Sequence, residues 1–255
     1  MGAREPEGVI PRFALQGNRP RCSGFCSCFA RTPLLKQQTI VYNGPGMESA
    51  DGIILAGGQS RRMGLNKALV EFHGQTLIER TIDALRSICG EIVIVANEPA
   101  AYARFGATTV PDSVPDFGPL AGLRAGLSAM RAELGLVVAV DMPFLNPTLL
   151  RAMIVAADGW DAVIPALAAG PSADAIRRSR AKDLDMHPLH AVYRRTCLPS
   201  IQAAIERDDR RLNAFFNDVR VRYFSADEIR AHDPEMRSLI NVNDPDELAQ
   251  ARRGG

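Results

Sequence analysis

Apolar residues along the chain fall into short β-branched runs that alternate with longer segments of helical period, starting at residue 51. Residues 52–55 (GIIL) are typical of a buried strand, and residues 76–88 place apolar side chains at the spacing of one helix face. The same pattern predicts further strands at 91–96, 108–110, 136–140, 162–164, 190–193 and 219–224, and helices at 120–132, from 146–147, at 199–207, 209–216 and 245–251. Strands that alternate with helices of about 10–15 residues indicate a mostly parallel sheet covered on both faces. We therefore expect a three-layer, Rossmann-like α/β fold in a single domain.

Four loops follow predicted strand ends, and they hold the most unusual residues of the chain. In such sheets ligands bind beyond the carboxyl ends of the strands. The loop after residue 55 is rich in glycine and basic residues, and the other three loops contain Asn97, Asp112 and Asp141. These four loops are the predicted location of the functional site.

The first loop, LAGGQSRRMGLNK at residues 55–67, combines paired glycines with basic side chains. Glycines let backbone N–H groups turn toward an anion, and Arg62 and Lys67 supply the positive charge that a triphosphate requires. The loop is not a P-loop, because Leu65 rather than lysine follows Gly64, and it lacks the spacing of the dinucleotide-binding motif. We expect a phosphate site of another type, and the alternative is an ordinary glycine turn with a solvated basic tip.

Asp141 ends a fully apolar strand, where a carboxylate is poorly solvated unless it meets a cation. Mg²⁺ binds through one or two carboxylates together with substrate phosphates, which suits a single aspartate at a strand end. The alternative is a structural aspartate that caps the turn into Pro143.

The 55–67 segment resembles the L-A-G-G-x-S-x-R-M-G-x-x-K signature of the molybdenum cofactor guanylyltransferases, within the wider nucleotidyltransferase fold. The resemblance spans about residues 51–251 and continues in PD at 111–112, GPLAG at 118–122, DMPF at 141–144, PLHAVY at 188–193 and INVNDPDEL at 240–248. Relatives that transfer cytidylate typically read L-A-A-G in the first motif, so Gly57 followed by Gly58 favours guanylate.

The resemblance implies a sheet of the nucleotide-diphospho-sugar transferase type and transfer of GMP from GTP to the terminal phosphate of molybdenum-bound molybdopterin, with release of pyrophosphate. It implies that Lys67, Arg62 and Asp141 are catalytic and that Asp141 holds Mg²⁺, the expected cofactor. The residues that it assigns to nucleotide binding are Leu55, Ala56, Gly57, Gly58, Ser60, Lys67, Asn97, Asp112, Gly118, Gly122 and Asp141, and those that it assigns to the acceptor are Asn241, Asn243 and His190.

Two of these residues have a structural alternative. Asn97 is also placed to cap a helix, and Asp112 to form an Asx-turn after Pro111. An acceptor facing the N1–H and N2–H₂ groups of guanine would give Asp112 a role in base selection. Other functions remain open at this point: a cytidylyltransferase acting on the same acceptor, a sugar-phosphate nucleotidyltransferase, and a non-enzymatic interaction protein of the same fold.

Residues 166–187 form a longer connection than we expect of the family, and they carry Arg177, Arg178, Arg180 and Lys182. The favoured interpretation of this irregular insert is a solvated surface loop. The alternatives are a segment that closes over the acceptor phosphate and a contact with a partner enzyme. The His187-x₂-His190 pair falls next to the PLHAVY strand of the family, so we do not expect a zinc site there.

Composition and charge exclude two classes of partner and set residues 1–46 apart from the rest of the chain. The net charge is +1, which gives no electrostatic basis for binding nucleic acid, and no apolar run approaches the length of a membrane span. Residues 1–46 hold six basic and two acidic residues and three of the five cysteines, without a sustained apolar period. We expect this extension to be disordered or foreign to the natural protein, with a transit peptide as the alternative and no metal site at its cysteines.

The enzyme itself is expected to be one nucleotidyltransferase domain at residues 47–255. It contains two cysteines, Cys89 and Cys197, consistent with a cytoplasmic protein. We expect a monomer or weak oligomer that contacts cofactor-insertion and recipient molybdoenzymes transiently, without a nucleic-acid or membrane partner.

Overall fold

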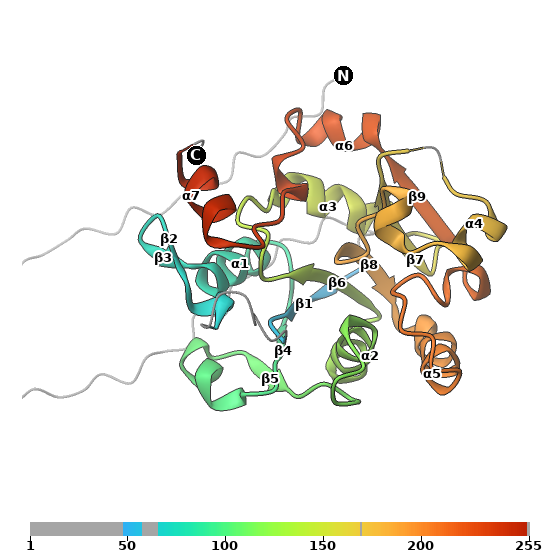
Figure 1. Ribbon diagram of the computed structural model, residues 1–255, viewed down its shortest axis with the longest axis horizontal. Coiled ribbons are helices and arrows are strands. Elements are labelled where there is room, and N and C mark those ends of the chain that lie inside the picture. The colour runs from blue at the N-terminus through green and yellow to red at the C-terminus, as the bar shows by residue number, and fades with distance from the viewer. Residues whose placement is uncertain (1–47, 58–65, 169, 254–255) are drawn as a thin grey trace, which may run out of the picture. The chain divides into compact units, whose positions relative to one another are not determined.

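The computed structural model describes residues 48–57, 66–168 and 170–253, all of which fall in one compact unit, Thr39–Gly255. Seven of the described strands form one sheet in the order β5-β4-β1-β6-β8-β7-β9 (Figure 1). Their bounds are β1 (Ala50–Leu55), β4 (Ile92–Val95), β5 (Thr108–Val110), β6 (Leu134–Ala139), β7 (Ala162–Ala166), β8 (His190–Arg194) and β9 (Val221–Ser225). The short strands β2 (Glu71–Phe72) and β3 (Gln75–Thr76) pair with each other in a separate hairpin.

The sheet is mostly parallel, as the sequence pattern predicted. β1 pairs in parallel with β4 and β6, β4 with β5, and β7 with β9. β8 alone runs against its neighbours, β6 and β7. The carboxyl ends of β5, β4, β1 and β6 therefore lie side by side along one edge, which brings the four predicted loops together.

Helices cover both faces of the sheet, which confirms the three-layer arrangement. α1 (Leu77–Arg86), α3 (Pro147–Val155), α6 (Ala226–His232) and α7 (Pro245–Arg253) contribute to one hydrophobic core. α2 (Pro119–Ala129), α4 (Ala173–Arg178) and α5 (Leu198–Glu206) contribute to the other. Successive residues of β1 supply both cores, since Ile53 packs with the α2 layer and Ile54 with the α1 layer. Such strands are apolar throughout because both of their faces are buried.

Helix starts follow the local signals in the sequence. The Asn146 side chain accepts hydrogen bonds from the amides of Thr148 and Leu149, with Pro147 at the first helical position of α3. The Asp244 side chain likewise accepts from two amides at the start of α7. In both starts an Asx residue is followed by proline, which is a helix-start signal that can be read from the sequence.

Two predictions about local structure are wrong. The helix predicted at 209–216 is absent, because α5 ends at Glu206 and the next helical turn is a 3-10 helix at Phe216–Asp218. The 166–187 segment is not irregular throughout, since it contains α4 and a 3-10 helix at Ala181–Leu184, and it buries Ile176, Ala181 and Met186. The sequence reasoning also missed α6, although Ser225 and Glu228 form a capping box that marks its start.

No helix in the described part of the chain is long and apolar enough to cross a membrane.

Candidate functional site

Lys67 and Asp141 form an ion pair at the carboxyl edge of the sheet. The Lys67 ammonium lies 3.1 Å from Asp141 Oδ2, and the two side chains are only 13% and 24% exposed. Asp141 follows β6, whereas Lys67 opens a 3-10 helix at Lys67–Leu69. The structure thus brings together two residues that the sequence singled out separately.

Local capping fixes Lys67 in place. The Asn66 side chain accepts a hydrogen bond from the Ala68 amide and so caps the short helix that Lys67 begins. The Asn66 amide group also donates to the hydroxyl of Tyr102, whose ring is buried. Sequence reasoning missed this positioning role of Asn66, although an asparagine just before a helical turn is a usable signal.

One carboxylate oxygen of Asp141 has no hydrogen-bond partner among the described residues and could coordinate a cation. Its Oδ1 is buried and has no hydrogen-bond partner among the described residues, while Oδ2 is paired with Lys67. No group of three or more histidine, cysteine, aspartate or glutamate side chains in the described ranges could hold a metal ion. A single carboxylate with an unpartnered oxygen fits a magnesium ion whose other ligands are water and substrate phosphates.

The segment that precedes α7 is held against Asp141. The Val242 amide donates to the Asp141 carbonyl at 2.9 Å. Asn241 lines the pocket beside Asp141, but Asn243 is not among the lining residues of that pocket. The Asn243 amide instead donates to the Glu247 carboxylate. The structure therefore places one of the two asparagines on the pocket wall.

Asp112, in the loop after β5, lies close to Gly57 of the first loop and to Gly122 of α2. A Cβ atom added to Gly57 would stand 3.6 Å from Asp112 Oδ2, and one added to Gly122 would stand 3.1 Å from Oδ1. Any side chain at Gly122 would press on this carboxylate, which gives a packing reason for glycine there. Burial raises the pKa of Asp112, and the hydrogen bond from Asn97 opposes that rise.

Asn97 holds Asp112 through two hydrogen bonds. Its side-chain amide donates to Asp112 Oδ2 at 3.3 Å, and its Oδ1 accepts from the Asp112 amide at 3.2 Å. The alternative role of Asn97 as a helix cap is wrong, since Glu98 occupies the cap position of the following 3-10 helix at Pro99–Phe105. Among the described residues, Asn97 donates the one hydrogen bond to the Asp112 carboxylate, so the Asx-turn is not formed there.

The start of α2 lies at the carboxyl edge of the sheet, next to the loop that contains Asp112. Gly118 takes φ +98° and ψ −168° as the residue that caps α2, a conformation that an L side chain rarely adopts. Pro119 follows at the first helical position, one residue earlier than predicted. The free amides of such a helix end favour an anion.

Leu55 ends β1, and Ala56 continues the backbone hydrogen bonding one residue past the strand. The Leu55 carbonyl accepts from the Val140 amide, and the Ala56 amide donates to the Val95 carbonyl. Gly58, Ser60 and Arg62, which the sequence assigned to the site, lie outside the described residues.

A pocket of about 490 Å³ opens beside Asp141. Its wall includes apolar side chains and basic ones from the 166–187 segment and from the loop after α5, together with Asn241. Sequence reasoning did not assign the loop residues Arg210 and Arg211 to a site, and both lie in the 209–216 segment that it predicted as a helix.

His190 does not reach this pocket. Its side chain is fully buried in β8, and both ring nitrogens lack a hydrogen-bond partner among the described residues. The pKa of His190 is lowered to about 3, first by burial and then by the neighbouring His187, while Asp233 acts in the opposite sense. His187, rather than His190, lines the pocket, so the predicted acceptor contact would require His190 to become exposed.

Comparison with solved structures defines the class of protein. Molybdopterin-guanine dinucleotide biosynthesis protein A from Archaeoglobus fulgidus is 26% identical, with a TM-score of 0.66, over 80% of this chain and 97% of that one. The 2-C-methyl-D-erythritol 4-phosphate cytidylyltransferase from Thermus thermophilus shares the fold at 17% identity, with a TM-score of 0.55, over 81% and 98% of the two chains. The fold is that of a nucleotidyltransferase.

Sequence comparison narrows the class to a family. The model of the MobA-like NTP transferase domain matches residues 52–223. The molybdenum cofactor guanylyltransferase of Desulfosudis oleivorans is 36% identical over 207 residues, which cover 80% of this chain and 95% of that protein. The chain belongs to the MobA-like NTP transferase family, together with the molybdenum cofactor guanylyltransferases. The family resemblance predicted from the sequence motifs is confirmed.

Proposed function

We propose that the protein transfers GMP from GTP to the terminal phosphate of molybdopterin and releases pyrophosphate. The observation that carries this proposal is the Lys67–Asp141 pair at the carboxyl edge of the sheet, with one Asp141 oxygen left unpartnered. The choice of GTP as donor and molybdopterin as acceptor is supported by relatives that are named molybdenum cofactor guanylyltransferase. The similarity to them covers most of both chains.

The chemistry needs charge neutralisation more than proton transfer. An oxygen of the acceptor phosphate attacks the α-phosphorus of GTP, a new P–O bond forms, and the bond to the β-phosphate bridging oxygen breaks. A phosphate monoester already carries a charge of about −1.5 to −2 near neutral pH, so the nucleophile requires no general base. The barrier lies in bringing two anionic groups together, and catalysis rests on positioning and on fixed positive charge.

Lys67 supplies such a charge from a half-buried position. Its ammonium is held by Asp141 and by the short helix that Asn66 caps, so little reorganisation is required when the phosphates bind. We infer that Arg62 adds a second positive charge, as the sequence motif predicts. A divalent cation, which we propose is Mg²⁺, would be held by Asp141 and the substrate phosphates and would supply further charge neutralisation.

Asp112 is the proposed selector of guanine. Its carboxylate is held by Asn97 beside Gly57 and Gly122 and offers acceptor oxygens. Guanine presents adjacent N1–H and N2–H₂ donors on one edge, whereas the corresponding edge of cytosine presents acceptors next to its amino group. A carboxylate at this place favours GTP over CTP, and the partial desolvation of Asp112 strengthens each hydrogen bond that it accepts.

The assay for this proposal is pyrophosphate release with each of the four nucleoside triphosphates, in the presence and absence of molybdopterin. Release with GTP that requires molybdopterin supports the proposal. Release with CTP instead identifies a cytidylyltransferase. A further reaction with a sugar phosphate in place of molybdopterin identifies a sugar-phosphate nucleotidyltransferase if it releases pyrophosphate. No release with any pair would contradict the enzymatic assignment.

The remaining proposals follow from the same assignment. We infer that residues 47–255 are the catalytic domain, and that cofactor-insertion and recipient molybdoenzymes contact it transiently. Cys89 and Cys197 are free and buried, in keeping with the proposed cytoplasmic location.

A further inference from the structure

The pocket beside Asp141 has a basic rim that the reaction at Lys67 does not explain. Arg180 and Lys182 come from the segment between β7 and β8, and Arg210 comes from the loop after α5. The pocket is otherwise largely apolar, with lining residues such as Phe117 and Leu212. A cavity of this kind suits a ligand with an apolar ring system and negative charge.

Described residues compensate only part of the charge of this rim. Asp141 is the one carboxylate among the lining residues, and Lys67 already pairs with it. Arg210 pairs with Asp208 and lies over the Phe117 ring. Arg180 and Lys182 are exposed, and neither side chain forms an ion pair or hydrogen bond with a described residue. These two cations are therefore available to a ligand.

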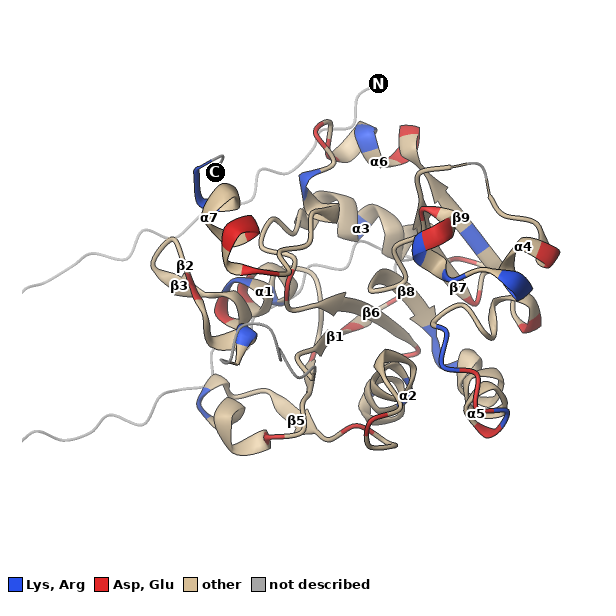
Figure 2. Cartoon of the chain, viewed as in Figure 1, with Lys and Arg blue, Asp and Glu red and all other residues tan. Residues whose placement is uncertain are grey.

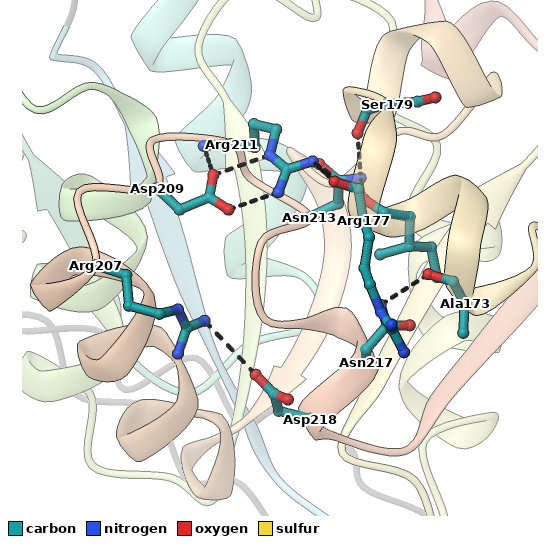
Figure 3. Close-up of polar contacts among 10 residues, drawn as sticks. Ala173, Arg177, Ser179, Arg207, Asp209, Arg211, Asn213, Asn217 and Asp218 are labelled. Atoms are coloured by element: carbon teal, nitrogen blue, oxygen red, sulfur yellow. Dashed lines mark hydrogen bonds and ion pairs between the residues drawn. The ribbon is translucent and has the colours of Figure 1, made fainter.

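The backbone that carries Arg180 is fixed by a latch, defined here as Asp209, Arg211 and Asn213 (Figure 3). Arg211 forms a two-point ion pair with Asp209, with nitrogen–oxygen distances of 2.9 and 2.6 Å. This pairing holds the pKa of the Asp209 carboxyl below its usual range. The same Arg211 guanidinium donates to the carbonyl groups of Ile176 and Arg177 in the last turn of α4.

Asn213 completes the latch from a fully buried position. Its amide donates to the carbonyl of Ile176 at 3.3 Å and to that of Ser179 at 3.0 Å. The last carbonyl groups of a helix have no partner within the helix, so side chains from the loop after α5 satisfy those of α4. The 166–187 segment is thus anchored immediately before Arg180 rather than free in solvent.

We propose that this anchored segment is the acceptor-binding wall of the pocket, in which Arg180 and Lys182 bind the anionic groups of molybdopterin. The inference rests on the proposed function and names the residues that recognise its acceptor. Arg180 supplies a planar guanidinium suited to oxyanions, and Lys182 supplies a second positive charge on the following 3-10 helix, Ala181–Leu184. The latch residues are positioning residues, because they act through the backbone of α4.

The first test is the double variant Arg180→Ala/Lys182→Ala, assayed for pyrophosphate release at varied molybdopterin and varied GTP. We expect the KM for molybdopterin to rise by about tenfold or more, the loss typical of one or two charge-assisted hydrogen bonds. The KM for GTP and the kcat should stay within about twofold of the wild-type values. The reason is that Arg180 and Lys182 would bind molybdopterin equally in the ground state and the transition state, and loss of such an interaction raises only the KM for molybdopterin.

Arg178→Ala is the matched control. Arg178 lies on α4, two residues before Arg180, and its exposed side chain pairs with Asp174. It does not line the pocket. Figure 2 shows that α4 carries both basic and acidic residues. We expect the KM of Arg178→Ala for molybdopterin to equal that of the wild type. Added salt should raise the wild-type KM for molybdopterin more steeply than that of the double variant, because salt screens exposed charges.

The second test addresses the latch. Asp209→Asn keeps the shape of the side chain and removes the charge that orients Arg211. We expect it to raise the KM for molybdopterin with the KM for GTP unchanged, and we expect Asp209→Glu to recover part of the loss. Thermal unfolding of each variant separates this effect from global destabilisation.

The outcomes distinguish the inference from the proposed function. If the wild type is active and the double variant binds molybdopterin as the wild type does, the acceptor wall is wrong and the function stands. Equal increases in both KM values, or a loss in Arg178→Ala equal to that of the double variant, would also overturn the wall. A wild type without molybdopterin-dependent pyrophosphate release would overturn both.

Discussion

Replacing Lys67 with alanine tests the catalytic pair most directly. The change removes an ammonium that lies 3.1 Å from Asp141 Oδ2, in a pair whose side chains are 13% and 24% exposed. Two effects follow. The phosphates lose a fixed positive charge, and Asp141 loses its partner while its other oxygen is already buried and unpartnered.

The burial of the pair allows the loss of activity and the loss of stability to be estimated separately. Loss of one preorganised donor costs about 3 kcal/mol of transition-state stabilisation, which is roughly a 10²-fold drop in kcat/KM. The pair is more buried than surface pairs worth about 0–1 kcal/mol and less buried than pairs whose disruption costs about 3–5 kcal/mol. We therefore expect the free energy of unfolding of Lys67→Ala to fall by about 1–2 kcal/mol, with the fold retained.

The assay combines initial rates of pyrophosphate release with urea unfolding. Arg131→Ala is the control, because Arg131 pairs with Glu91 at 2.8 Å on the amino-terminal side of β4 and is 80% exposed. It should change neither activity nor stability appreciably. A Lys67→Ala enzyme within about threefold of the wild-type kcat/KM would refute the proposed role of the lysine.

Three further predictions follow from the same structure. Asp141→Asn should fold normally but lose Mg²⁺-dependent activity, measured as rate against magnesium concentration; an unchanged dependence would identify another ligand. Asp112→Asn should lower the ratio of kcat/KM for GTP to that for CTP by about tenfold, since an amide group replaces one of the two acceptor oxygens of the carboxylate with an NH₂ donor, and an unaltered ratio would place base selection elsewhere. Because burial lowers the pKa of His190 from its ordinary 6.5 to about 3, the unfolded chain binds an extra proton between these pH values, so stability falls as pH falls through this window. Urea unfolding of His190→Leu between about pH 6 and pH 4 should show a slope smaller by up to about 1.4 kcal/mol per pH unit than that of the wild type, and equal slopes would contradict burial of a neutral His190.

Some of the site could be predicted because its signals are local. Asp141 stands at the end of an apolar strand, and both the strand and the following turn are visible within a few residues of sequence. Asn146 and Asp244 cap the helices that follow them, as their own side chains and the next proline dictate. Signals of this range survive folding because their partners are neighbours in the chain.

The errors arise where distant partners override local preference. Residues 209–216 have a helical pattern, yet Arg211 and Asn213 bond to carbonyl groups of α4, more than 30 positions away in the chain. His190 has the polarity of a site residue, but its place on β8 between β6 and β7 buries it. The residues next to them in the sequence predict neither the absence of the 209–216 helix nor the burial of His190.

The sequence by itself determined the seven strands of the main sheet, most of the helices that cover it and the four loops at its carboxyl edge, because hydrophobic period and capping act over a few residues. Only the tertiary structure decided which side chains meet. Lys67 reaches Asp141 across 74 positions, and Asn97 reaches Asp112 across 15, because β1, β4, β5 and β6 align their carboxyl ends in one sheet. The anchored acceptor wall likewise depends on hydrogen bonds between α4 and the loop after α5, which form only once both segments pack on the same face of the sheet.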